Sequence, residues 1–136
     1  MVKTILTLSF LLFTISGYAQ NTIGLTSYTA DSENGYTLFS PNQSNDVFLI
    51  DNCGQLVHSW TTDVRPGLSC YLLENGNLLR TKKIVQPYFN GGGVGGGLEI
   101  IDWDSNVIWS YDLADSLQCH HHDVEILPNG NILVIA

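Results

Sequence analysis

The chain has 136 residues, with 13 acidic and five basic side chains and a formal net charge of −8 at pH 7. A chain this acidic repels nucleic acid and anionic membrane surfaces, so we expect neither of them as a partner. The three cysteines are an odd number and lack the close spacing of a zinc ribbon. We therefore expect isolated thiols, although an exported chain can also form one disulfide.

Residues 1–19 have the pattern of a signal peptide. Lys3 precedes an apolar stretch over residues 5–15, and Gly17-Tyr18-Ala19 supplies the small residues of a cleavage site. The apolar stretch is too short to span a bilayer as an anchor. We expect an exported protein, periplasmic, secreted or at the cell surface, with residues 20–34 as a linker and no membrane span in the mature chain.

Short apolar runs bounded by Gly, Asn, Asp or Pro follow the signal peptide, and they predict antiparallel strands without helices. The first predicted strand covers residues 35–39. Four hairpins come next, with strand pairs 48–51 and 55–60, 69–73 and 77–81, 98–102 and 107–111, and 123–127 and 131–135. Asn-Gly turns are a strong hairpin signal because both residues tolerate a positive φ.

The hairpins form an internal repeat of about 50 residues. Asp51 corresponds to Asp102 at an offset of 51 residues, and Asn75 corresponds to Asn129 at an offset of 54. A repeat of this length made of short strands is typical of β-propeller blades. Since both aspartates recur at one hairpin position, we interpret them as residues that cap the turn rather than as catalytic groups.

The predicted fold is all-β, an incomplete β-propeller over residues 35–136. We expect each Asn-Gly hairpin to be the inner pair of a blade and each Asp-containing hairpin the outer pair. The chain then holds the outer pair of one blade, a full blade over about residues 66–112 and the inner pair of the next. A propeller closes with about four or more blades, and the sequence stops within an apolar run at Ala136, so we expect a fragment.

The histidine triplet His120-His121-His122, followed by Asp123, is the most informative local feature. Imidazole acts as a nucleophile, a general base or a metal ligand. If the next strand begins this early, His120 and His122 share one side and Asp123 is placed to orient a ring. The alternative is a polar loop whose histidines make structural hydrogen bonds.

Arg65 corresponds in the repeat to Cys119, beside the triplet. At a channel mouth its guanidinium can bind a sulfate or phosphate, and the alternative is a salt bridge to Asp63 or another nearby acid. The glycine run 91–97 lacks a following Lys-Ser/Thr and leads into a strand, so we expect a flexible loop rather than a nucleotide site. Strand alternation places Arg65, the triplet and the glycine run on one face.

Two further groups of residues have structural interpretations. Aromatic side chains in blades fill the space between sheets, so we expect Trp60, Trp103 and Trp109 to pack there. Lys82 and Lys83 are adjacent in the sequence, and we expect a solvated pair rather than a pair of active-site groups.

Several strings in both copies resemble the bacterial arylsulfotransferase family, and the resemblance covers about residues 35–136. The more specific part is His121-His122-Asp123 followed by Leu127-Pro128-Asn129-Gly130-Asn131. The other strings are Leu49-Ile50-Asp51-Asn52-Cys53-Gly54-Gln55-Leu56-Val57-His58-Ser59-Trp60, Arg65-Pro66-Gly67, Leu73-Glu74-Asn75-Gly76-Asn77-Leu78-Leu79-Arg80, Ile100-Ile101-Asp102-Trp103 and Val107-Ile108-Trp109-Ser110-Tyr111.

The resemblance implies an exported six-bladed propeller that moves a sulfuryl group from an aryl sulfate to a phenol through a transient sulfohistidine. It implies no nucleotide sulfate donor, no cofactor and no metal. The family's His-His-Asp position maps to His121 and His122 as catalytic residues, with Arg65 and His120 as candidates for substrate binding. Its other active-site residues fall beyond Ala136, so we expect the fragment alone to be inactive.

Two other hypotheses remain open at this stage. The chain can be a non-catalytic propeller that serves as a secreted binding or surface-display module and has kept the blade pattern. The triplet can also be part of a metal site. Further His and Arg residues facing the channel favour the enzyme, whereas stoichiometric zinc or copper indicates the metal site.

Overall fold

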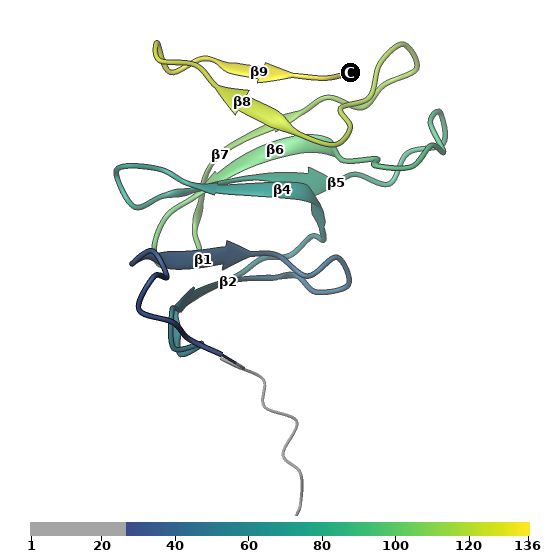
Figure 1. Ribbon diagram of the computed structural model, residues 1–136. Coiled ribbons are helices and arrows are strands. Elements are labelled where there is room, and N and C mark those ends of the chain that lie inside the picture. Colours follow the sequence, from purple (N-terminus) through teal and green to yellow (C-terminus); the bar gives the residue numbers. More distant parts are fainter. Residues whose placement is uncertain (1–26) are drawn as a thin grey trace, which may run out of the picture.

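The computed structural model describes residues 27–136, which form nine β-strands and no helix (Figure 1). The all-β prediction is therefore confirmed for this part of the chain. The predicted signal peptide, residues 1–19, and the first part of the linker lie outside the described residues. From residue 27 onward there is no helix with the length and apolar character needed to cross a membrane.

The strands form three antiparallel sheets, each a simple meander. The first sheet contains β1 (Tyr36–Phe39), β2 (Asp46–Asp51) and β3 (Leu56–Thr61). The second contains β4 (Pro66–Leu72), β5 (Leu78–Lys83), β6 (Gly96–Ile101) and β7 (Val107–Asp112). The third contains β8 (Val124–Ile126) and β9 (Ile132–Val134). All four predicted hairpins are present, and the range predicted for a full blade is the range of the four-stranded sheet.

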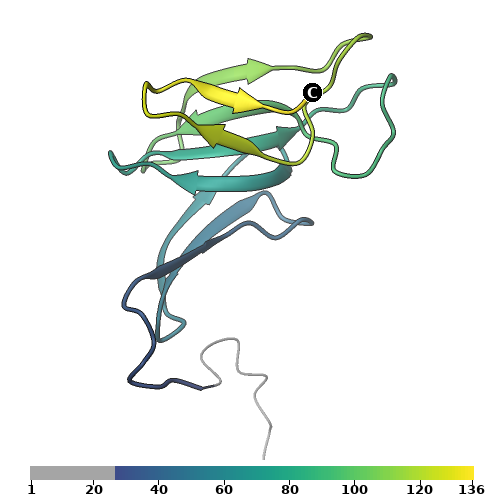
Figure 2. The same cartoon turned by 45° about the horizontal axis from the view of Figure 1, so that its top comes forward.

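The sheets stack in chain order, with the second between the first and the third (Figure 1, Figure 2). Residues 27–136 form an open stack and not a closed ring. The internal repeat and the stacked sheets are both compatible with successive propeller blades, but a propeller requires a closed ring of blades. The propeller therefore stays a prediction.

One turn geometry serves all four hairpins. In the first, Gly54 N–H donates to Asp51 O at 2.9 Å and Asp51 N–H donates to Gln55 O at 3.0 Å, and the same pair of bonds recurs in the others. The residue with positive φ is a glycine in three turns and Ser105 in the fourth, with φ 69°. The Asn-Gly signals identify their turns because this conformation favours glycine.

The predicted capping role of the two repeated aspartates is confirmed. Asp51 Oδ1 accepts main-chain hydrogen bonds from Cys53 and Gln55, both at 2.8 Å. Asp102 Oδ1 accepts the equivalent bond from Asn106 N–H at 2.8 Å. The Asn106 side-chain amide also donates to Asp102 and, as the largest cause, holds the pKa of that carboxyl below its usual range. Both aspartates are therefore turn residues.

Two apolar cores lie between the three sheets, one on each face of the second sheet. Leu78 and Leu79 are neighbours on β5 and point to opposite faces, as adjacent strand residues do. Leu78 joins the core against the first sheet, with Val47, Leu49, Trp60 and Ile101. Leu79 joins the core against the third sheet, with Leu98 and Val124. Burial on both faces explains why β5 begins with two adjacent leucines.

The three tryptophans differ in their environments. Trp60 is fully buried and its indole N–H donates to Asp102 O at 3.0 Å. Trp103 stacks on His58, with ring centroids 3.9 Å apart, and meets Trp60 edge-on. These two have the predicted packing role. Trp109 is 40% exposed and borders a hollow with Ile100 of β6 and Ile132 of β9, so it faces the third sheet without being fully covered.

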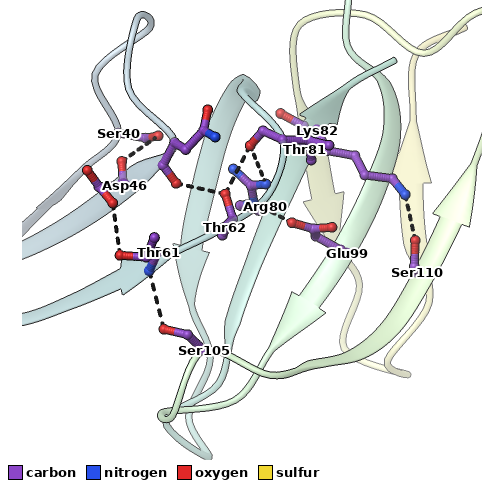
Figure 3. A network of polar contacts seen from close by, with 12 residues as sticks. Ser40, Asp46, Thr61, Thr62, Arg80, Thr81, Lys82, Glu99, Ser105 and Ser110 are labelled. Carbon is purple, nitrogen blue, oxygen red and sulfur yellow. Dashed lines mark hydrogen bonds and ion pairs between the residues drawn. The ribbon is translucent and has the colours of Figure 1, made fainter. Parts of the chain in front are cut away.

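A polar network lies between the first and second sheets (Figure 3). Arg80 on β5 is fully buried, and its Nε donates to Glu99 Oε1 on β6 at 2.6 Å. Its Nη2 donates to Val64 O at 2.8 Å. Lys82 forms the second ion pair of the described residues, with Asp112 at 2.6 Å. Lys82 is therefore partly buried and paired, so the prediction of a solvated lysine pair is wrong for this residue.

Candidate functional site

Three connections meet at one end of the second sheet. They are residues 62–65 before β4, residues 84–95 between β5 and β6, and residues 113–123 between β7 and β8. The register at this end pairs Pro66 with Lys82, Lys83 with Gly96 and Gly97 with Asp112. Figure 1 shows the last two connections projecting from the same side of the stack. This arrangement agrees with the expectation that Arg65, the histidine triplet and the glycine run share one face.

The histidine triplet lies in this last connection and not in a strand. β8 begins only at Val124, and His122 has a left-handed backbone with φ 65°. The expected alternation, with His120 and His122 on one side, is therefore wrong. Instead His121 and His122 face each other, with their Nδ1 atoms 2.8 Å apart and their ring planes 82° apart. His121 is half-buried and His122 is exposed.

His120 lies beneath this pair and is fully buried. Its Nε2 lies 3.3 Å from the main-chain oxygen of Asp123, so the ring proton is at Nε2. Its Nδ1 is buried without a partner. Burial lowers the pKa of His120 below its ordinary value, which keeps the ring neutral. A side chain without exposed surface cannot touch a substrate, so its expected binding role is not supported by this placement.

The second half of the glycine run packs directly on the histidines. His122 N–H donates to Gly93 O at 2.8 Å, and the N–H groups of Gly95 and Gly96 donate to His120 O at 3.1 and 2.9 Å. A Cβ atom at Gly93 would overlap the His122 ring, and one at Gly95 would lie 2.6 Å from His120 Nδ1. The expected flexible loop is therefore wrong for residues 95–97, which are buried.

Replacing Gly95 with alanine should destabilise the protein and displace the histidine loop. The new methyl group meets the buried His120 ring, and overpacking of this kind costs about 1–3 kcal/mol. Gly92→Ala is the matched control, because a Cβ there meets nothing within 4 Å. Urea unfolding of the two variants measures the difference. Equal midpoints for Gly95→Ala and Gly92→Ala would contradict the close packing.

Asp123 has a different partner from the one expected. Its Oδ1 accepts a hydrogen bond from the Tyr71 hydroxyl at 2.7 Å and another from Val124 N–H at 2.8 Å. The carboxylate of Asp123 therefore orients no imidazole. The hydrogen bond raises the pKa of Tyr71 to about 12 and lowers the pKa of Asp123 below its usual range. The Tyr71–Asp123 bond ties β4 to the histidine loop.

Arg65 and Lys83 are the unpaired cations of the described residues. The other two basic residues there, Arg80 and Lys82, form ion pairs. Arg65 and Lys83 form none, and the salt bridge from Arg65 to Asp63 is not made. Lys83 N–H donates to Arg65 O at 2.9 Å, so these two exposed cations are neighbours at the histidine end of the sheet.

A cleft of about 450 Å³ opens beside the histidine pair. Lys83, Phe89, Gly93 and Val94 are among the residues that line it. Val94 forms a β-bridge with His121, and the Phe89 ring stacks on the His121 ring with centroids 6.2 Å apart. Sequence reasoning did not predict this cleft. The available signal was Phe89 two residues before Gly91, the start of the glycine run, where small residues leave room for an aromatic ring.

No three His, Cys, Asp or Glu side chains within residues 27–136 are grouped so that they could hold a metal ion.

All three cysteines are free: Cys53 is exposed, Cys70 is partly buried and Cys119 is buried. The expectation of isolated thiols is therefore confirmed.

Comparison with known proteins adds no relative to this description. No protein-family model, no curated protein and no solved structure matches the chain. The structure itself defines an all-β chain of three stacked antiparallel sheets. At one end of this stack it brings together an imidazole pair, two unpaired cations and a cleft.

Proposed function

We propose that this chain is part of an exported aryl-sulfate sulfotransferase built as a β-propeller. The resemblance in the His-His-Asp segment and in the repeated turns supports the proposal. So does the stack of antiparallel meanders, which is how blades pack in a propeller. The observation that carries it is the His121–His122 pair, accessible to solvent and on the same end of the sheet as Arg65 and Lys83.

The hydrogen bond between the two rings gives them different chemical roles. One Nδ1 must donate its proton to the other, because the two atoms are 2.8 Å apart. In a neutral pair the donating ring then has a bare Nε2, which is a nucleophile. The accepting ring carries its own proton on Nε2, which is a hydrogen-bond donor. Whichever ring donates, the pair presents one nucleophile and one donor.

These roles suit the transfer of a sulfuryl group. The bare Nε2 attacks sulfur, the S–O bond to the aryl group breaks, and the phenolate leaves with the electron pair. The acceptor phenol then attacks the sulfohistidine, the N–S bond breaks, and its electrons return to Nε2. The proton lost by the acceptor balances the one gained by the released phenolate. Arg65 and Lys83 supply positive charge for the sulfuryl oxygens.

A second candidate function is a secreted binding or surface-display module. The exposed side chains of β7 favour it, since Trp109 and Tyr111 stack with ring centroids 6.2 Å apart and are 40% and 52% exposed. Exposed apolar patches mark interaction sites in many proteins. This module needs no chemistry at the histidine pair, which makes the two functions separable.

The test uses the purified protein as its gene encodes it, with 4-nitrophenyl sulfate as donor and phenol as acceptor. We expect release of 4-nitrophenol together with phenyl sulfate. Quenching during turnover and peptide mass spectrometry should find a sulfuryl group on His121 or His122. Absence of both transfer and adduct would reject the enzyme and leave the binding module.

A further inference from the structure

We propose that the cleft beside the histidine pair binds the aromatic ring of an anionic ligand, with Phe89 as its wall and Lys83 holding the anionic group. The inference rests on the proposed function, because it assigns the substrate-binding part of the same site. It also predicts binding that can be measured without any turnover.

The size and floor of the cleft suit a flat ligand. Its volume of about 450 Å³ lies in the usual range for small-molecule sites, about 300–1,000 Å³. The glycines at positions 91–93 line one part of it. Gly92 is open to close approach by an aromatic ring, since a Cβ there would meet nothing within 4 Å, whereas the rings of Phe89 and His122 cover Gly91 and Gly93.

Phe89 is held in place as the wall of the cleft. Its main-chain N–H donates to Gln86 Oε1 at 2.8 Å, and its main-chain oxygen accepts from Gln86 Nε2 at 2.6 Å. Gly91 leaves room for the ring, since a Cβ there would lie 2.7 Å from Phe89 Cζ. Phe89 stacks on His121 and also lines the cleft. A ligand ring against Phe89 therefore lies next to the histidine pair.

The positive charge near the cleft favours an anionic group on the ligand. Two adjacent unpaired cations are unusual in a chain with 13 acidic residues, each of which is a possible partner. Lys83 lines the cleft, whereas Arg65 is its main-chain neighbour and lies outside the lining. Guanidinium and ammonium groups are the preferred donors for sulfate and related oxyanions. The cleft therefore favours a ligand that joins an aromatic ring to an anionic group.

The experiment measures binding and kinetics of 4-nitrophenyl sulfate, with inorganic sulfate as a second probe. Phe89→Ala should raise the Kd and KM for the aryl sulfate about tenfold, as expected for a lost aromatic contact. Its affinity for inorganic sulfate should stay the same. Lys83→Gln should weaken both probes, and Lys83→Arg should restore both. Tyr88→Ala is the matched control, because it removes an exposed neighbouring aromatic ring that does not line this cleft.

Phe89→Leu repeats the test with a smaller loss of volume, and melting temperatures show that each variant folds. Equal affinity of the wild type, Phe89→Ala and Phe89→Leu for the aryl sulfate would overturn the proposal, as would no binding to the wild type. Phe89-dependent binding without transfer would support the cleft as a binding site and reject the proposed enzyme. Transfer with a KM that does not depend on Phe89 would support the enzyme and reject the cleft as its binding site.

Discussion

Replacing Glu99 with glutamine should destabilise the protein by about 3–5 kcal/mol. Arg80 is fully buried and Glu99 nearly so, and their Nε–Oε1 distance is 2.6 Å. The substitution keeps the shape of the side chain and removes its charge, so the guanidinium stays buried without a counter-charge. A loss of this size is a large part of the total stability of a small domain, about 5–15 kcal/mol.

The matched control is the other ion pair of β5. Lys82 pairs with Asp112, whose side chain is 67% exposed. Asp112→Asn should therefore cost no more than about 1 kcal/mol, since exposed ion pairs contribute little. Urea unfolding of Glu99→Gln and Asp112→Asn measures both effects. Equal midpoints for the two variants would contradict a buried, mutually dependent pair.

The double variant Arg80→Met with Glu99→Leu separates burial of charge from loss of packing. It removes both charges and keeps apolar volume, so it should recover most of the stability lost in Glu99→Gln. Val64 O loses its bond from Arg80 Nη2, but Thr62 Oγ1 lies 2.9 Å away and can still donate to it. A double variant as unstable as Glu99→Gln would show that packing, and not charge, sets the cost.

The strands were predictable because their signals are local. Asn-Gly turns fix the hairpins, and the repeat of Asp51 and Asp102 shows that these carboxylates serve turns. The stacking of the sheets agrees with the internal repeat, which predicts blades that pack one against the next. Trp109 faces the third sheet but stays 40% exposed, because an aromatic residue on a strand does not reveal how completely another sheet covers it.

The Arg80–Glu99 pair was missed although a signal was present. Arg80 directly follows two leucines and Glu99 interrupts an apolar run, and the two strands are neighbours in the predicted meander. Their register places the two residues opposite each other. Opposite charges at facing strand positions predict a cross-strand pair.

The geometry of the histidine site could not be predicted in the same way. It depends on where β8 begins and on the left-handed backbone of His122, and strand alternation gives neither. The glycines held the only clue. Gly93 and Gly95 are small because histidine rings occupy the space their side chains would need.

Replacing His122 with asparagine should lower kcat for aryl sulfate transfer about a hundredfold or more, the usual effect of losing one positioned group that acts on developing charge. Asparagine is the better choice over alanine because it tolerates the positive φ of 65° at this position. It removes the ring that faces His121 at 2.8 Å, so the remaining imidazole loses the partner that sets its proton.

His121→Gln should have an effect of similar size, since neither ring keeps its role without the other. Arg65→Ala should act more modestly and mainly on KM, because it removes charge from the binding of sulfate. His58→Gln is the matched control: it removes an imidazole that stacks on Trp103, away from the pair. Wild-type turnover in both His121→Gln and His122→Asn would make the triplet a structural loop. The binding module would then be the function that remains, because only the enzyme needs two imidazoles held ring to ring.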